Sequence, residues 1–506
     1  MKRYLILASA ALLSLSACEE DTESTPEAVD SGAETSQNQT RAGSGGSGGS
    51  GGSRATAGAP ARPTGNGGSG GGGAVARDAG SDDGDGPESN NGSEPNNPQQ
   101  PATDAGTPPA ANGGAATPAD IVDTAVAAGS FKQLAAALTK AGLVDALKGP
   151  GPFTVFAPTD AAFDALEKAK PGTVAGLTNE QLTAVLQYHV VSGAAVKAAD
   201  LKNGQLVKTL AGPVAAVDLS GDKPKINGVT ISSTDIVATN GVIHVIDQVL
   251  LPPGDIIEVA TAAGSFTKLA EALTAAELVD DLKGAGPFTV FAPTDAAFAK
   301  LSAAPSGEAL KSVLLYHVLE GTVGPADLKE GGAAKTLSGS PVLFTLNGGA
   351  KINDAVISTT NVVAKNGVIH VIDSVIVPPA DDIVATAIAA GTFTQLAAAL
   401  TSADLVGALQ APGPFTVFAP TDEAFAALGT APTGDALKNV LLYHVANGAV
   451  GSGDLKAGPV PTLLTDKNLT IDLTGGVKVN DATVTTANIL TKNGIIHVVN
   501  KVLVPN

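Results

Sequence analysis

Two kinds of hydrophobic spacing follow one another along the chain from about residue 117 onward. Phe131, Leu134 and Leu138 are spaced at i, i+3 and i+7, which predicts a helix with one apolar face. Later runs rich in Val and Ile predict strands at 214–219, 225–231, 235–238 and 242–251. Helices first and strands afterwards are typical of an α+β module rather than of a doubly wound sheet.

Short polar motifs mark the ends of these elements. Pro158-Thr159-Asp160 ends the strand predicted at 153–157, and we expect it to cap the helix that follows. Thr178, with Gln181 three residues later, predicts a capping box. The pairs Asn227-Gly228 and Asn240-Gly241 predict tight turns between strands.

The same series of motifs occurs three times. The string Phe-Thr-Val-Phe-Ala-Pro-Thr-Asp at 153–160 recurs at 288–295 and 415–422. A Tyr-His pair follows in each copy, and the histidines of successive pairs lie 128 and 127 residues apart. This period is too long for a solenoid repeat, so each copy is expected to be an independent domain. The predicted domains are 117–252, 253–379 and 380–506.

The first 17 residues predict a secretion signal. Positive charge at Lys2 and Arg3 precedes a mostly apolar run that is too short to cross a hydrocarbon core of about 30 Å. The run ends in Leu-Ser-Ala-Cys, which resembles the bacterial lipobox, so we expect cleavage before Cys18 and lipid attachment to it. The alternative is an ordinary signal peptide followed by a chance cysteine.

Residues 18–116 are predicted to be a disordered tether. They are rich in Gly, Ser, Asn, Pro, Thr and Asp, and they carry 14 acidic residues against four arginines. A segment with so few large apolar side chains buries too little surface to offset its ordering entropy. As a random coil it would span roughly 50–60 Å, which would hold the domains away from a membrane.

Overall charge and cysteine content exclude several function classes. The chain has 30 Lys plus Arg against 49 Asp plus Glu, so its net charge of −19 disfavours nucleic-acid partners. Cys18 is its one cysteine, which excludes disulfides, thiolate nucleophiles and cysteine metal sites from the domains. We predict no cofactor and no metal site.

The repeated motifs together resemble the fasciclin domain over about residues 117–506. The resemblance implies a wedge-shaped β-sandwich of about seven strands decorated by helices, and extracellular adhesion through arrays of domains. In animal members, the Tyr-His region and a later Asp-Ile segment are linked to integrin binding. We do not carry that receptor over to a bacterial protein. The candidate binding residues that the resemblance implies are Tyr188, His189, Asp235, Ile236, Tyr316, His317, Tyr443 and His444. The later copies depart from the second motif, since Asn361-Val362 and Asn488-Ile489 lack the acid.

The histidines allow a catalytic interpretation and a structural one. Pairing a histidine with Asp160 or a nearby serine would give an acid–base device, but Asp160 is expected at a helix cap. His244, His370 and His497 lie in apolar strands, which favours core positions. The Tyr-His pairs are either core residues or part of a contact surface. No catalytic residue is assigned, and we predict that the protein is not an enzyme.

The sequence therefore predicts a cell-surface adhesion or binding protein. Three closely joined domains would bind matrix, polysaccharide or a cell-surface protein by avidity. Glu19 after Cys18 indicates lipid anchoring in the outer membrane, with the domains exposed. The alternatives are an envelope spacer, and an enzyme acting on surface polymer, which the lack of a catalytic constellation disfavours.

Overall fold

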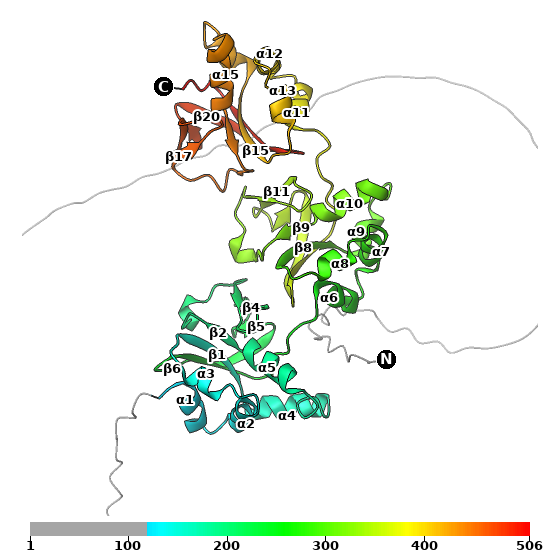
Figure 1. Ribbon diagram of the computed structural model, residues 1–506, viewed down its shortest axis with the longest axis vertical. Coiled ribbons are helices and arrows are strands. Elements are labelled where there is room, and N and C mark those ends of the chain that lie inside the picture. Colours follow the sequence, from blue (N-terminus) through cyan, green and yellow to red (C-terminus); the bar gives the residue numbers. More distant parts are fainter. Residues whose placement is uncertain (1–118, 506) are drawn as a thin grey trace, which may run out of the picture. The chain divides into compact units, whose positions relative to one another are not determined.

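A computed structural model describes residues 119–505, and these residues form three modules with one shared order of elements (Figure 1). Modules 1, 2 and 3 denote residues 119–252, 253–379 and 380–505. The predicted signal peptide, Cys18 and the predicted tether lie outside the described residues. The α+β prediction is confirmed, because helices open each module and strands dominate its second half.

Module 1 contains the helices α1 Ile121–Ala127, α2 Lys132–Lys140, α3 Val144–Lys148, α4 Asp160–Ala169 and α5 Asn179–Tyr188, and the 3₁₀ helix η1 Ala198–Asp200. Its strands are β1 Phe153–Pro158, β2 Val190–Ser192, β3 Leu206–Lys208, β4 Val214–Asp218, β5 Lys225–Ile226, β6 Val229–Ala238 and β7 Gly241–Ile246. The strand predicted at 225–231 is thus two strands, separated by the Asn227-Gly228 turn. Both residues of this turn have positive φ, 49° and 78°, as a two-residue hairpin turn requires.

Modules 2 and 3 repeat this order. Module 2 contains α6 Ile256–Ala263, α7 Thr267–Ala275, α8 Val279–Lys283, β8 Phe288–Pro293, α9 Asp295–Ala299, α10 Gly307–Tyr316, β9 Val318–Glu320, η2 Pro325–Asp327, β10 Ala333–Lys335, β11 Pro341–Thr345, β12 Lys351–Ile352, β13 Ala355–Ala364 and β14 Gly367–Ile372. Module 3 contains α11 Ile383–Ala390, α12 Thr394–Ser402, α13 Val406–Gln410, β15 Phe415–Pro420, α14 Asp422–Ala426, α15 Gly434–Tyr443, β16 Val445–Asn447, β17 Gly458–Pro461, β18 Asn468–Asp472, β19 Lys478–Val479, β20 Ala482–Thr491 and β21 Gly494–Val499.

The seven strands described in module 1 pair in the order β2-β1-β7-β6-β5-β4-β3. Only β1 and β7 run parallel; the other neighbours are antiparallel. The two edge strands nevertheless meet, because the N–H of Leu210, after β3, donates to the carbonyl of Val190 in β2 (2.7 Å). The sheet therefore curls back on itself, which gives the expected sandwich-like core and covers strand edges that would otherwise be free to pair.

Each face of the sheet covers its own hydrophobic cluster. In β1, Val155 and Ala157 pack among the helices, while Phe156 between them packs inside the curled strands. This is the period-2 alternation of a strand that is buried on both sides. Modules 2 and 3 contain the same two clusters. Figure 1 shows the helices of each module gathered at one side of its strands.

The helix caps differ in one respect from the sequence prediction. The capping box of Thr178 and Gln181 is confirmed at α5. The cap of α4 is Thr159, which accepts from the N–H of Ala162, and not Asp160. The Asp160 carboxylate instead accepts from the N–H of Gln133 in the first turn of α2 (2.8 Å), a helix that has no side-chain cap at its own N-cap residue. Asp160 therefore joins two helices, a role that local spacing does not reveal.

Candidate binding surface

The tyrosine of each Tyr-His pair is a core residue. Tyr188, the last residue of α5, is 1% exposed. Its hydroxyl donates to the carbonyl of Val214 (3.0 Å) and accepts from the side-chain amide of Asn227 (2.6 Å). Burial raises the pKa of Tyr188. The same hydroxyl–amide pairs recur as Tyr316 with Asn353 and Tyr443 with Asn480.

The histidine of each pair is buried as well. His189 is 2% exposed; its Nδ1–H donates to the carbonyl of Val185 (2.8 Å), and its Nε2 accepts from the N–H of Leu250 (2.9 Å). Burial lowers its pKa to about 4, so the ring is neutral at pH 7. His317 and His444 make the same pair of bonds. Of the two roles that the sequence left open for these pairs, the described conformation fits the structural one.

The second histidine of each module lies in the last strand. In β7, the Nε2–H of His244 donates to the carbonyl of Val196 (2.9 Å), and Nδ1 accepts from the N–H of Asp235 (3.4 Å). The ring also stacks on Phe156, with 5.5 Å between ring centroids. His370 and His497 are held in the same way. The chain contains six histidines, and both ring nitrogens of each are engaged by backbone groups.

These bonds leave little room for acid–base or metal chemistry at the histidines. A ring nitrogen would have to release a backbone partner before it could bind a proton of a substrate or a cation. Among residues 119–505, no three His, Cys, Asp or Glu side chains gather in an arrangement that would hold a metal ion.

Asp235 and Ile236 differ from the Tyr-His pairs because both are partly exposed. Asp235 lies at an irregularity in the pairing of β6 with β7 and has a φ of 59°, a conformation that Asp and Asn tolerate better than most residues. Its carboxylate accepts from the N–H of Ala198 (2.8 Å). Ile236 packs against the helix-side cluster. Of the candidate residues, Asp235 therefore offers the one partly accessible charged group.

The counterparts of Asp235 in the later modules contact the preceding module. Asn361 and Asn488 have the same left-handed backbone, with φ of 58° and 66°. The side-chain amide of Asn361 donates to the carbonyl of Gly204 in module 1 (3.0 Å). That of Asn488 donates to the carbonyl of Gly331 in module 2 (3.5 Å). The absence of the acid from these two copies is visible in the sequence, but sequence reasoning did not connect it with a contact between modules.

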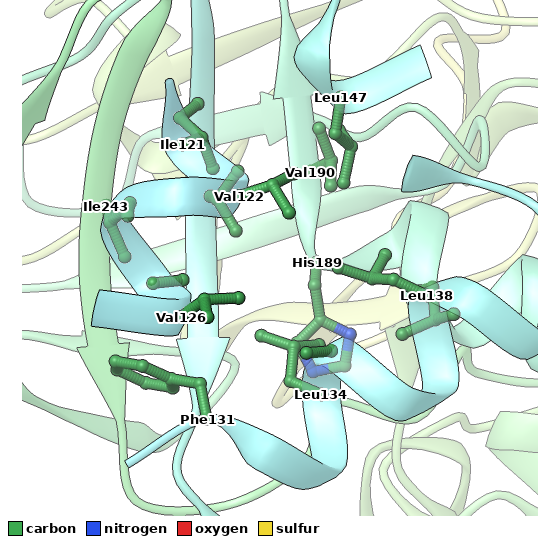
Figure 2. Close-up of a pocket in the computed structure, with 14 residues that line it drawn as sticks. Ile121, Val122, Val126, Phe131, Leu134, Leu138, Leu147, His189, Val190 and Ile243 are labelled. Carbon is green, nitrogen blue, oxygen red and sulfur yellow. The ribbon is translucent and has the colours of Figure 1, made fainter. Parts of the chain in front are cut away.

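A small apolar cavity lies between the helices and the sheet of module 1 (Figure 2). Side chains of α1, α2 and α3 line it together with His189, and its volume is about 20 Å³. Module 3 has an equivalent cavity of about 20 Å³ beside His444. Such a volume holds about one water molecule, and apolar walls offer that water no partners. We interpret both cavities as packing gaps rather than as ligand sites.

Three segments of the chain, residues 129–252, 264–378 and 391–505, match the family model described as Fasciclin domain. The chain is 31% identical over 391 residues to transforming growth factor-beta-induced protein ig-h3 of Sus scrofa, a match covering 74% of this chain and 56% of the relative. It is 44% identical over 134 residues to the Synechocystis sp. protein sll1735, covering 26% of this chain and 97% of that protein. The chain spans about half the length of the first relatives it matches, 45% and 56%.

A FAS1 domain pair from the insect cell adhesion molecule fasciclin I is similar at 17% identity, with a TM-score of 0.25, over 50% of this chain and 98% of that one. In the stretch from 119 to 505, no helix is both long enough and apolar enough to cross a membrane.

Proposed function

Because the chain belongs to the fasciclin domain family, we propose that it is a cell-surface adhesion or binding protein that presents three such modules to an extracellular partner. The observation that carries the proposal is the repetition itself: three modules share one order of elements and the same internal bonds. Linked copies of one binding module gain avidity without new contacts, by factors of about 10²–10⁴. The partner classes we propose are matrix, polysaccharide and cell-surface protein.

The sequence outside the described residues supports attachment of these modules to a membrane. In this proposal Cys18 carries the lipid, and residues 19–116 separate it from the first module. A single acyl chain gives only marginal anchoring, so stable attachment requires more than one chain on the cysteine. The proposed location is the outer membrane, with the modules facing outward.

Binding, rather than catalysis, suits the chemistry of the described residues. The histidine rings are hydrogen-bonded to backbone groups, and the Asp160 carboxylate is hydrogen-bonded to the first turn of α2. The tyrosine hydroxyls are equally committed, each to one carbonyl and one asparagine. The described residues carry more acidic than basic side chains, so the surface that remains accessible is mainly acidic.

Stepwise removal of modules tests the proposal. The full chain is compared with chains lacking 380–506 or 253–506, each applied to arrays of polysaccharides and matrix proteins. We expect apparent affinity to fall at least tenfold with each module removed, because the effective concentration of the next module is lost. An enzyme would instead keep full activity until one particular module was removed.

A chain that binds nothing on these arrays or on intact cells, while still holding its modules away from the membrane, would support the spacer alternative. Anchoring is tested separately with Cys18→Ser. We expect this variant to appear in the medium, while the parent fractionates with outer membrane and is released from intact cells by added protease.

A further inference from the structure

The contacts between consecutive modules repeat at equivalent positions. At the first junction, Asn361 of β13 donates to Gly204, and at the second, Asn488 of β20 donates to Gly331. The two bonds span the same sequence separation, 157 residues. The same contact therefore occurs at both junctions, with an asparagine side-chain amide as donor and a glycine carbonyl as acceptor.

Glycines on the module that carries the donating asparagine allow this close approach. A Cβ atom on Gly324 would lie 2.9 Å from the carbonyl oxygen of Gly204. On Gly451, the counterpart of Gly324, a Cβ atom would overlap the carbonyl oxygen of Gly331. Gly324 has a φ of −95°, which any residue adopts, so its backbone conformation does not require glycine. Glycine is required here because a side chain would collide with the neighbouring module.

Module 1 carries different residues at both positions. Lys197 stands where modules 2 and 3 have glycine, and Asp235 stands where they have asparagine. A lysine side chain would occupy the space of a docked module, and a carboxylate has no N–H to donate to a carbonyl. Val237 in β6 is accordingly 67% exposed, whereas its counterparts Val363 and Leu490 are only partly exposed.

The surroundings of Asn361 indicate that this side chain serves the junction rather than its own module. In modules 1 and 3, the side-chain oxygen at this position accepts from the N–H of Ala198 or Ser452. In module 2 the equivalent residue is Pro325, which has no N–H, and the Oδ1 of Asn361 is buried without a partner. The hydrogen bond that remains to this side chain is the one to Gly204.

We propose that these two positions decide whether a module accepts another module, and that Lys197 and Asp235 close the array against a second copy of this chain. The docking element of that second copy would be the Gly458 loop of its module 3, the counterpart of Gly204 and Gly331. Such a contact joins two different surfaces, head to tail, so an unblocked end would let copies add in series. Lysine and aspartate at 197 and 235 keep the array at three modules.

The first test places the module 1 residues in module 2 of the full chain, as Gly324→Lys with Asn361→Asp. We expect modules 1 and 2 to separate, which small-angle scattering detects as a larger maximum dimension and limited proteolysis as faster cleavage within 251–255. The matched control is Gly407→Lys with Asn447→Asp, at two exposed positions away from the junctions. Unchanged scattering and cleavage in the junction variant would overturn the proposal.

The second test is the reverse change, Lys197→Gly with Asp235→Asn, in a full chain that also carries Cys18→Ser so that lipid cannot cause association. Linked modules face each other at roughly millimolar effective concentration, so sedimentation is followed up to about 1 mM. We expect the average molar mass of the sedimenting particles to increase with concentration in this variant and not in its Cys18→Ser parent. A variant that stays monomeric throughout contradicts the role assigned to positions 197 and 235.

Discussion

The imidazole of His189, at the end of α5, accepts a hydrogen bond from the backbone N–H of Leu250, beyond the end of β7 (2.9 Å). The ring thereby holds the segment through which the chain leaves module 1. His317 and Ile376 form the same link in module 2, and His444 and Leu503 in module 3. The bond requires an unprotonated Nε2, so it makes the stability of each module depend on pH.

We expect the free energy of unfolding to fall as the pH is lowered from about 6.5 to about 4. Burial lowers the pKa of His189, His317 and His444 from 6.5 to about 4, so in this window the unfolded chain binds protons that the folded chain does not. The loss amounts to about 3 kcal/mol per histidine. Below about pH 4 both states are protonated, and this contribution no longer changes. Denaturant titrations from pH 7 to pH 4 measure it, and a flat profile between pH 6.5 and 5 would contradict it.

The tyrosine hydroxyls predict a second effect on stability. Tyr188→Phe leaves the carbonyl of Val214 and the amide of Asn227 without their partner in a buried setting. We expect a cost of about 1–3 kcal/mol. A double-mutant cycle with Asn227→Gly, which keeps the left-handed backbone, isolates the hydroxyl–amide term. Strictly additive effects of the two changes would show that the pair does not interact.

The carboxylate of Asp295, which caps α7 from outside that helix, is the basis of a third prediction about stability. Its carboxylate accepts from the N–H of Lys268 at the start of α7 (2.7 Å), and this bond holds the pKa of Asp295 below its usual range. Asp295→Ala is expected to cost about 1 kcal/mol, as for loss of a helix cap, and Asp295→Asn less, because an amide oxygen still accepts. The cost of each variant relative to the parent should shrink as the pH falls through the pKa of Asp295, because the parent then loses the carboxylate charge that accepts this bond. Thermal unfolding at pH 7 and pH 3 checks both statements.

The sequence predicted local features well and long-range ones poorly. The capping box at Thr178 and the turn at Asn227 depend on residues a few positions apart, so local pattern suffices to find them. The strand predicted to reach Leu251 ends at Ile246, because the chain then turns to meet His189, a contact across 61 residues. Asp160 was expected at the cap of the following helix, and Asn361 was noted only as a departure from the Asp-Ile motif. Their hydrogen-bond partners lie 27 and 157 residues away. No periodicity encodes such pairings.

The orphaned side-chain oxygen of Asn361 gives the final prediction. Pro325→Ser supplies the missing N–H, as Ser452 does for Asn488 in module 3. A buried acceptor without a partner costs about 1–3 kcal/mol, while losing proline returns about 0.4–1 kcal/mol of entropy to the unfolded chain. We therefore expect a net stabilisation of module 2 of about 1 kcal/mol, measured by thermal unfolding.

The reciprocal control is Ala198→Pro in module 1. This change removes the N–H that donates a hydrogen bond to Asp235. Module 2 already has proline at the equivalent backbone position. Asp235 is a partly exposed carboxylate, so water can replace the lost donor. We therefore expect Ala198→Pro to destabilise module 1 by about 1 kcal/mol, the lower end of the cost of a buried acceptor without a partner. If Pro325→Ser destabilises module 2 while Ala198→Pro leaves module 1 unchanged, then the N–H at this position does not stabilise the side chain at the β-strand irregularity, and the role assigned to the bond of modules 1 and 3 is wrong.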